Sequence, residues 1–155
     1  MRNFFITGFK AAGKTDFGVK FSEKLGWLFV DLDQLIIQDT SAGSPYELYQ
    51  IVGEEAFRRR EAETLDNLLS KKFCNTVFSL GGMTPLNPFL NSDLKRYGII
   101  ILIDTPLEII KERISKQKSI YSDSESGIDN LYHERIIKLR EMADIIITNY
   151  NMEDI

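Results

Sequence analysis

A glycine-flanked loop directly after an apolar stretch constrains the fold of this chain more than any other feature. The loop, GFKAAGKT from Gly8 to Thr15, follows the apolar stretch Asn3 to Thr7 and matches the pattern G-x-x-x-x-G-K-[ST]. Where a buried strand enters such a loop and a helix leaves it, backbone N–H groups and the positive end of the helix face a phosphate group. A chance match in a strand-to-helix turn is the alternative, and the strand context disfavours it.

The loop therefore predicts a nucleoside triphosphate site, followed by a helix that begins near Lys14. In such a site Lys14 reaches the β- and γ-phosphates, and Thr15 offers its hydroxyl to Mg²⁺. The pattern does not indicate which molecule accepts the phosphate.

Length and composition indicate one globular domain. With 155 residues, 43% of them apolar and 27% charged, the chain can bury a single core. Its net charge of −4 argues against a nucleic-acid partner, which requires a broad basic face. The longest strongly apolar run, Ile99 to Ile103, is too short to span a bilayer, and the N-terminus shows no signal-peptide pattern. We therefore expect a cytoplasmic protein without membrane contact and, without an obvious large apolar surface, a monomer.

The single cysteine and the single histidine offer no metal site. Cys74 has no partner for a disulfide or a cysteine-based metal site, so we expect it to be a small packing residue in a reduced compartment. His133 lies in a polar helical stretch without metal-ligand partners, and we expect it on the surface.

Short apolar runs alternate with longer segments of helical period along the chain. Such alternation indicates a parallel sheet with helices on both faces. The expected strands are Asn3 to Thr7, Leu28 to Asp31, Thr76 to Ser79, Ile99 to Ile103 and Asp144 to Thr148.

Two longer segments between these strands differ in character. The segment from Glu54 to Lys71 is expected to be the longest helix, because apolar residues recur in it at spacings of three, four and seven. These residues should pack on the sheet; they are Ala56, Phe57, Ala62, Leu65, Leu68 and Leu69. The polar and acidic stretch from Ser119 to Asn130 is expected to be a mobile loop and a candidate lid.

Polar residues and glycines follow two further strands, where ligands of open parallel sheets bind. Asp31 and Asp33 come at the end of the second strand, and the two-residue period turns both carboxylates to the same side. One can bind Mg²⁺ through water while the other accepts a hydroxyl proton, or one of them caps a helix beginning near Gln34. Gly81 and Gly82 allow backbone to approach a ligand closely, or they form a simple turn.

The order and spacing of these motifs resemble the shikimate kinase family, a branch of the nucleoside-monophosphate-kinase-like phosphate-loop proteins. The family shows a G-x-x-G-x-G-K-[ST] loop, then F-x-D-x-D, G-E-x-x-F-R-x-x-E, a triple glycine, an arginine-led lid and a late R-x-x-x-Y. The corresponding residues here are Gly8 to Thr15, Phe29 to Asp33, Gly53 to Glu61, Gly81 to Met83, Lys118 and Arg135. The resemblance runs from the first strand to Thr148.

This resemblance implies a three-layer α/β/α fold of the phosphate-loop NTPase type around a five-stranded parallel sheet. It implies a single kinase domain over residues 1–155, with a lid at approximately 117–130. The implied reaction is ATP-dependent phosphorylation of the shikimate 3-hydroxyl, giving 3-phosphoshikimate and ADP. A kinase of another small hydroxy acid or of a nucleotide is one alternative, and a non-catalytic ATP-binding module with a degenerate lid is another.

The same resemblance assigns roles to particular residues. Thr15 and Asp31 would serve Mg²⁺, and Lys14, Asp33 and Lys118 would be catalytic. ATP would contact Gly8, Lys10, Ala11, Ala12, Gly13, Lys14 and Thr15, with Arg113 near the adenine, and shikimate would contact Asp33, Arg58, Gly81, Gly82 and Arg135.

Arginine suits a carboxylate substrate because its planar guanidinium makes two parallel charge-assisted bonds. Successive side chains on a helix point about 100° apart, so the three arginines of Arg58 to Arg60 cannot all face one ligand. We expect Arg59 and Arg60 in solvent or paired with glutamates such as Glu55 and Glu63. Arg140 is an alternative to Arg135 for the second arginine of the clamp.

Four positions depart from the family pattern and bear on rate and substrate fit more than on fold. Lys118 replaces the lid arginine, Met83 the third glycine, Ala11 the middle loop glycine, and Leu139 the late tyrosine. Lysine keeps the charge but loses the planar fork. The family's last helix is expected to be short or absent, which leaves adenine contacts near Asn149 to Asn151 open.

Overall fold

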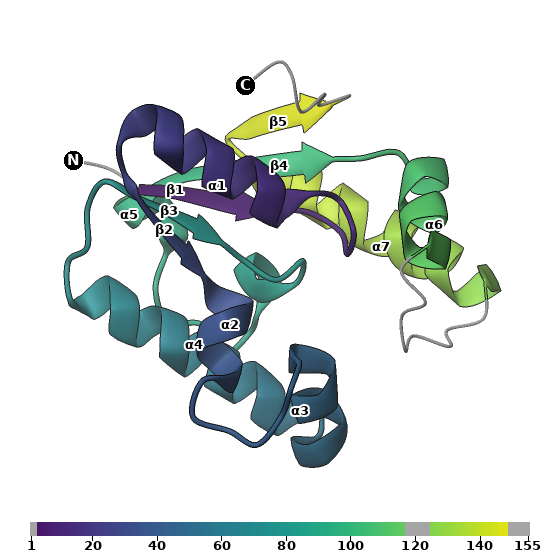
Figure 1. The fold of residues 1–155 in the computed structure, drawn as a ribbon, viewed down its shortest axis with the longest axis horizontal. Helices are drawn as coiled ribbons and strands as arrows, with labels where there is room; N and C mark the ends of the chain where they lie inside the picture. Colours follow the sequence, from purple (N-terminus) through teal and green to yellow (C-terminus); the bar gives the residue numbers. More distant parts are fainter. Residues whose placement is uncertain (1–2, 117–124, 149–155) are drawn as a thin grey trace.

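The structure, a computed structural model, describes residues 3–116 and 125–148 and shows a sheet with helices on both sides (Figure 1). The strands are β1 (Asn3–Thr7), β2 (Leu28–Asp31), β3 (Thr76–Ser79), β4 (Gly98–Asp104) and β5 (Ile145–Thr148). The helices are α1 (Lys14–Leu25), α2 (Leu32–Ile37), α3 (Pro45–Val52), α4 (Glu54–Ser70), α5 (Leu94–Tyr97), α6 (Leu107–Lys116) and α7 (Glu125–Met142), with a 3₁₀ turn η1 (Thr84–Leu86).

The sheet is parallel throughout, with the strand order β2-β3-β1-β4-β5. The five expected strands are thereby confirmed, and their bounds differ from the expected ones by one residue at most. β1 lies at the centre, where Phe4 stands opposite Val77 of β3 and Ile99 of β4. The loop after β1 therefore leaves from the middle of the carboxyl edge of the sheet.

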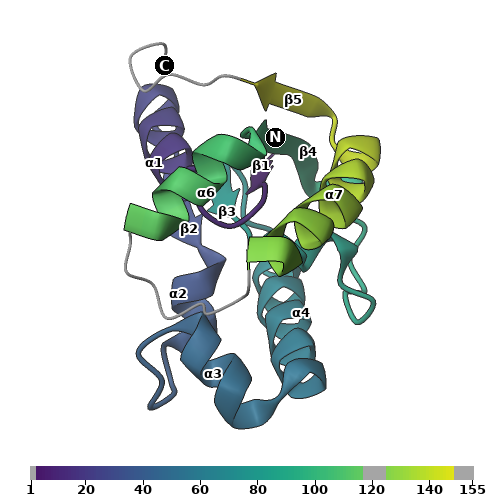
Figure 2. The same cartoon turned by 90° about the vertical axis from the view of Figure 1, so that its right-hand side faces the viewer.

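Alternate residues of the central strands pack on opposite faces. Phe5 and Ile100 belong to the core cluster formed with α2 and α4, whereas Ile6 and Ile101 pack with Phe17 of α1. Figure 2 shows α1 on one side of the sheet and α4 and α7 on the other. Because both faces are covered, these strands appear in the sequence as nearly continuous apolar runs.

The helix α3 stands beyond the sheet and packs on α2 and α4 (Figure 1). Ser44 caps it, accepting a hydrogen bond from the backbone N–H of Glu47, and Pro45 occupies its first turn. Leu48 is the buried residue of α3. The helix thus forms one wall beside the carboxyl edge rather than a layer of the sheet.

The long helix α4 confirms the expected amphipathic helix, with one correction. Leu65 is fully buried, but Ala56 is exposed. The two residues are separated by nine positions, which at about 100° per residue places them on opposite sides of the helix. The buried face instead includes a charged residue, Glu61.

Two other expectations are wrong. Cys74 is exposed, because it lies in the turn between α4 and β3 rather than in the core. The stretch expected as a loop from Ser119 to Asn130 is helical from Glu125 on. Ile128 continues the four-residue spacing of the buried α7 residues and is itself buried, which explains the earlier start of the helix.

Residues 117–124, which include Lys118, lie outside the described residues, as does the segment from Asn149 to Asn151. The surface position of His133 is confirmed. Neither described segment contains a helix that is both long and apolar enough to cross a bilayer.

Candidate active site

Two glycines of the phosphate loop have backbone angles that side chains rarely allow. Gly8 and Gly13 have φ values of 156° and 97°. A Cβ at Gly8 would lie 2.6 Å from the carbonyl oxygen of Ile103 in β4. Helix α1 begins at Lys14, as expected, so the N-terminal end of the helix lies directly at the loop.

Lys14 lies inside this loop. Its Nζ donates hydrogen bonds to the carbonyl oxygens of Gly8 and Phe9, each at 3.0 Å. Burial lowers the pKa of Lys14, while the nearby charges of Asp33 and Asp31 oppose the shift. The loop and two carboxylates therefore surround one partly buried cation, a group suited to neutralising phosphate charge.

Two side chains from later parts of the sequence donate hydrogen bonds to backbone carbonyl oxygens of the phosphate loop. Arg113 of α6 donates to the carbonyl oxygen of Ala11 at 3.0 Å, and Thr105 Oγ1 donates to that of Ala12 at 2.8 Å. Ala11, where the family has glycine, has a φ of 59° in the left-handed region. Arg113 is thus in contact with the phosphate loop from the α6 side.

Asp31 joins the start of α2 to the start of α1. Its Oδ1 accepts a hydrogen bond from the backbone N–H of Asp33 at 3.0 Å, so it caps α2, which begins at Leu32 rather than near Gln34. Thr15 Oγ1 donates to its Oδ2 at 3.2 Å. The capping alternative is therefore correct for Asp31, and the same carboxylate also meets the hydroxyl proposed to serve Mg²⁺.

The oxygens of Thr15 and Asp31 fit Mg²⁺, which prefers hard oxygen ligands and completes its shell with waters and substrate phosphates. Within residues 3–116 and 125–148, no group of three or more histidine, cysteine, aspartate or glutamate residues could hold a metal by itself. The residues present therefore suit a metal ion that is bound together with a nucleotide.

Asp33 lies in the first turn of α2 among several charges. Burial raises its pKa to about 6, although Lys14 and Arg58 oppose the shift and Asp31 and Glu61 add to it. A carboxylate with such a pKa can accept a proton near neutral pH.

The glycines after β3 bring this strand end against the phosphate loop. A Cβ at Gly82 would lie 2.8 Å from the carbonyl oxygen of Gly8, and one at Gly81 would lie 3.5 Å from Asp33 Oδ1. Gly81 also accepts a hydrogen bond from the backbone N–H of Thr84 at 3.1 Å, so the turn interpretation holds as well. These glycines therefore allow the end of β3 to lie close to other protein segments, namely the phosphate loop and α2.

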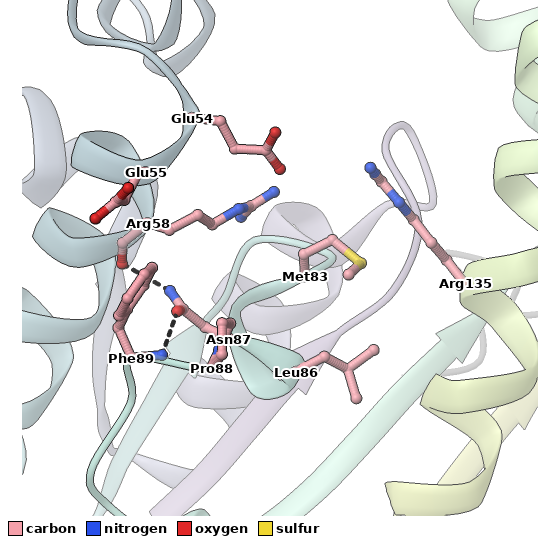
Figure 3. A pocket seen from close by; sticks show the side chains of 9 residues that line it. All are labelled: Glu54, Glu55, Arg58, Met83, Leu86, Asn87, Pro88, Phe89 and Arg135. Atoms are coloured by element: carbon pink, nitrogen blue, oxygen red, sulfur yellow. Dashed lines mark hydrogen bonds between the residues drawn. The ribbon is translucent and has the colours of Figure 1, made fainter.

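A cavity of about 440 Å³ opens beside these residues. Figure 3 shows Arg58 of α4 and Arg135 of α7 pointing into it from opposite sides. Its lining residues are Glu54, Glu55, Arg58, Met83, Leu86, Asn87, Pro88, Phe89 and Arg135. Burial and the nearby Arg58 lower the pKa of Arg135, while Glu134 and Glu54 oppose the shift.

Arg58 is oriented by a glutamate that the sequence analysis left without a role. Glu61 Oε2 accepts from Arg58 Nη1 at 3.0 Å and from Asn87 Nδ2 at 2.8 Å, and its Oε1 accepts from Thr84 Oγ1 at 2.6 Å. The side chain of Glu61 is only 2% exposed. A charged residue on the apolar face of the helix, three positions after Arg58, was the signal that could have identified it.

The other arginines are now placed. Arg59 pairs with Glu55 at 2.8 Å, as expected. Arg60 donates to the carbonyl oxygen of Ile36 at 2.6 Å, a backbone contact that was not expected. Arg140 is bound to Asp104 at 2.7 Å and does not line the cavity, so Arg135 is the arginine that faces Arg58.

Comparison with known proteins identifies the family. The family model described as shikimate kinase matches residues 10–154. The chain belongs to the shikimate kinase family. This membership confirms the resemblance read from the motifs, the phosphate-loop fold, and an ATP-dependent kinase that phosphorylates an alcohol group.

Individual relatives of the shikimate kinase family match nearly the whole chain. The protein from Aromatoleum aromaticum is 32% identical over 146 residues, covering 92% of this chain and 82% of the relative. The one from Clostridium botulinum strain Loch Maree is 31% identical over 159 residues, covering 99% and 91%.

Solved structures agree with these relatives. Shikimate kinase from Acinetobacter baumannii, in complex with shikimate, has a TM-score of 0.83 and 29% identity over 97% of this chain and 85% of that chain. The enzyme from Aquifex aeolicus has a TM-score of 0.80 and 30% identity over 98% and 90%.

Proposed function

We propose that the protein phosphorylates the 3-hydroxyl of shikimate with ATP, and that shikimate binds in the cavity between α4 and α7. The observation that carries this proposal is the cavity in which Arg58 and Arg135 face each other beside Asp33 and the phosphate loop. Two guanidinium groups suit a substrate carboxylate, because each can form parallel charge-assisted bonds with it. The carboxylate would then be fixed at one end of the acceptor, with its hydroxyls toward Asp33.

The reaction needs positioning and charge neutralisation more than covalent chemistry. Asp33 accepts or orients the proton of the attacking hydroxyl, and Lys14 offsets charge on the transferred phosphoryl group. On binding ATP, Lys14 Nζ exchanges its bonds to the carbonyl oxygens of Gly8 and Phe9 for phosphate oxygens. Gly81 and Gly82 hold the end of β3 close to Asp33 and the phosphate loop, beside which both substrates would bind.

Thr15 and Asp31 would hold Mg²⁺, which supplies a positive charge that bridges phosphate oxygens. The backbone of Gly8, Lys10, Ala11, Ala12 and Gly13 would surround the phosphates, and Arg113 would lie near the adenine. Its contact with the carbonyl oxygen of Ala11 supports a place at the edge of the nucleotide site.

Lys118 would add a further cation from a lid over approximately residues 117–130, whose last residues form the start of α7. We also propose that the protein acts as a monomer in the cytoplasm, as expected for an enzyme of small soluble substrates. The net charge of −4 supports the absence of a nucleic-acid partner.

The first experiment measures ADP release from ATP and Mg²⁺ with shikimate, gluconate or the common nucleoside monophosphates as acceptor. We expect a rate that depends on shikimate. A rate that depends on another acceptor would assign a different substrate, and ATP binding without any product would assign a non-catalytic role.

Variants at neighbouring arginines test the clamp. Arg58→Ala should lower kcat/KM for shikimate roughly 100-fold, because a desolvated charge partner of the carboxylate is lost. Arg59→Ala is the matched control, since Arg59 is the adjacent arginine, half exposed and paired with Glu55 at the surface. Equal effects of the two substitutions would contradict the clamp.

A further inference from the structure

Met83 lies in the acceptor cavity at a position whose backbone conformation any residue, including glycine, can adopt. Its φ and ψ are −108° and −5°, an ordinary conformation for any residue. In the family pattern given above, a glycine stands here, as the third of the triple glycine. The side chain at this position therefore reflects the cavity rather than the turn.

Figure 3 shows the thioether of Met83 projecting into the cavity between Arg58 and Arg135. The residue is only partly buried, so its side chain forms a wall that a bound acceptor would touch. Leu86, on the same turn, adds a second apolar group below it.

The residues on either side hold Met83 in place. Gly82 lies against the phosphate loop, where an added Cβ would be 2.8 Å from the carbonyl oxygen of Gly8. Thr84 is fully buried, and its hydroxyl donates to Glu61 at 2.6 Å. The backbone of Met83 is therefore anchored between the phosphate loop and Glu61, the residue that also orients Arg58.

We propose that Met83 is a specificity-determining residue, which restricts the acceptor at the carbon that bears the carboxylate. This inference rests on the proposed function, because it takes Arg58 and Arg135 as the carboxylate clamp. A side chain between the two guanidiniums must lie next to that carbon of the substrate. A flat carbon that bears only the carboxylate packs against the thioether, whereas an added hydroxyl facing the thioether would lose its water without gaining a partner from this side chain.

The same wall strengthens the clamp. An apolar group between two guanidiniums excludes water from the space beside the carboxylate, and charge-assisted bonds are stronger where water is excluded. Met83 therefore contributes both to affinity for shikimate and to rejection of acceptors that carry a polar substituent at this position.

The test compares shikimate with quinate, which carries a hydroxyl on the carboxylate-bearing carbon, in wild-type protein and in Met83→Ala, Met83→Gly and Met83→Leu. We expect Met83→Ala and Met83→Gly to raise KM for shikimate several-fold, to leave kcat nearly unchanged, and to reduce the shikimate-to-quinate ratio of kcat/KM by on the order of tenfold. Met83→Leu, of similar volume and polarity, should keep the wild-type ratio. Met142→Ala is the control, because Met142 is a methionine of the core that does not line the cavity.

The outcomes separate this inference from the proposed function. An unchanged ratio in the alanine and glycine variants, with a wild-type protein that phosphorylates shikimate, overturns the role of Met83 alone. A fall in kcat for both acceptors at constant KM also overturns it, because that result indicates a structural role. A wild-type protein inactive on shikimate overturns the proposed function and the inference together.

Discussion

Asp33 is a partly buried carboxyl near Lys14, and its protonation state decides whether it can assist a hydroxyl acceptor. Burial raises its pKa to about 6. Only the ionised carboxylate accepts a proton, so kcat/KM for shikimate should fall about tenfold per pH unit below about pH 6. A pH profile of kcat/KM between about pH 5 and pH 8 checks this. A flat profile through pH 6 would contradict the role of Asp33.

The same pKa links Asp33 to stability. Between the ordinary value of 3.8 and about 6, the folded state binds this proton more tightly than the unfolded chain, so stability falls as pH rises through that window. Asp33→Asn should therefore raise the free energy of unfolding at neutral pH by on the order of 1–3 kcal/mol while it abolishes phosphorylation. Urea unfolding measures the difference, which should largely vanish near pH 4, where both side chains are neutral. Equal free energies of unfolding for the two proteins at neutral pH would show that the ionised Asp33 carboxylate does not destabilise the fold.

Ala11 holds a left-handed conformation in which a Cβ is unfavourable. With a φ of 59°, it costs roughly 1–2 kcal/mol that glycine does not. Ala11→Gly removes this cost, but glycine also has greater freedom in the unfolded chain, which offsets part of the gain. The substitution should therefore stabilise the protein by about 0.5–1 kcal/mol. Thermal unfolding measures this, and Ala62→Gly, inside helix α4, should change stability in the opposite direction.

At the scale of elements, Asp31 has two tasks that different substitutions can separate. It caps α2 and also meets Thr15 at the proposed metal position. Asparagine caps a helix as well as aspartate, so Asp31→Asn should keep the stability that Asp31→Ala loses, about 1 kcal/mol. Both variants lose the charge, so both should need more Mg²⁺ for half-maximal activity. A wild-type Mg²⁺ dependence in Asp31→Asn would remove the residue from the metal site.

The strands could be predicted from the sequence because each appears as a short apolar run, which in the central strands β1, β3 and β4 reflects burial on both faces. Helix α7 could not be delimited in the same way. Its first turns carry Ser126 and Gly127, and Ile128 is recognised as a core residue only when Phe9 and Leu107 are packed around it. The short elements α5 and η1 likewise depend on neighbours distant in the sequence, because a single turn carries too little pattern.

At the scale of the whole molecule, the site was predictable where one motif supplies several neighbours in space. The proximity of Lys14 and Thr15 follows from one motif, whereas Asp31 meets Thr15 from the end of the next strand. Glu61 carried a signal, a charge on the apolar face of α4, but its partners Thr84 and Asn87 come from a turn more than twenty positions later and could not be read from that helix. The sequence analysis named Arg135 with Arg140 as its alternative, and the structure separates the two, because Arg140 is bound to Asp104 and Arg135 lines the cavity.

Asn3 connects the starts of three strands, so replacing it should destabilise the whole sheet. It is 2% exposed. Its Nδ2 donates to the carbonyl oxygens of Phe73 and Tyr97, and its Oδ1 accepts from the backbone N–H of Thr76. Asn3→Ala leaves these groups unpaired and should lower the free energy of unfolding by roughly 2–4 kcal/mol in urea titrations.

The control for this substitution is Asn67→Ala, at an exposed position of α4, which should change stability by no more than about 0.5 kcal/mol. A similarly small effect at Asn3 would mean that water replaces its bonds at the edge of the sheet.

The central place of β1 also sets an order of events during synthesis. β1 is synthesised before the other four strands, yet the hydrogen bonds of Asn3 reach partners 70 and 94 residues later in the chain. At about 5–20 residues per second, roughly 5–20 s pass before both neighbouring strands exist. Throughout that interval an apolar segment followed by a flexible glycine loop has no sheet to join. The nascent chain is therefore most open to chaperones and to aggregation at the very segment that later binds the nucleotide.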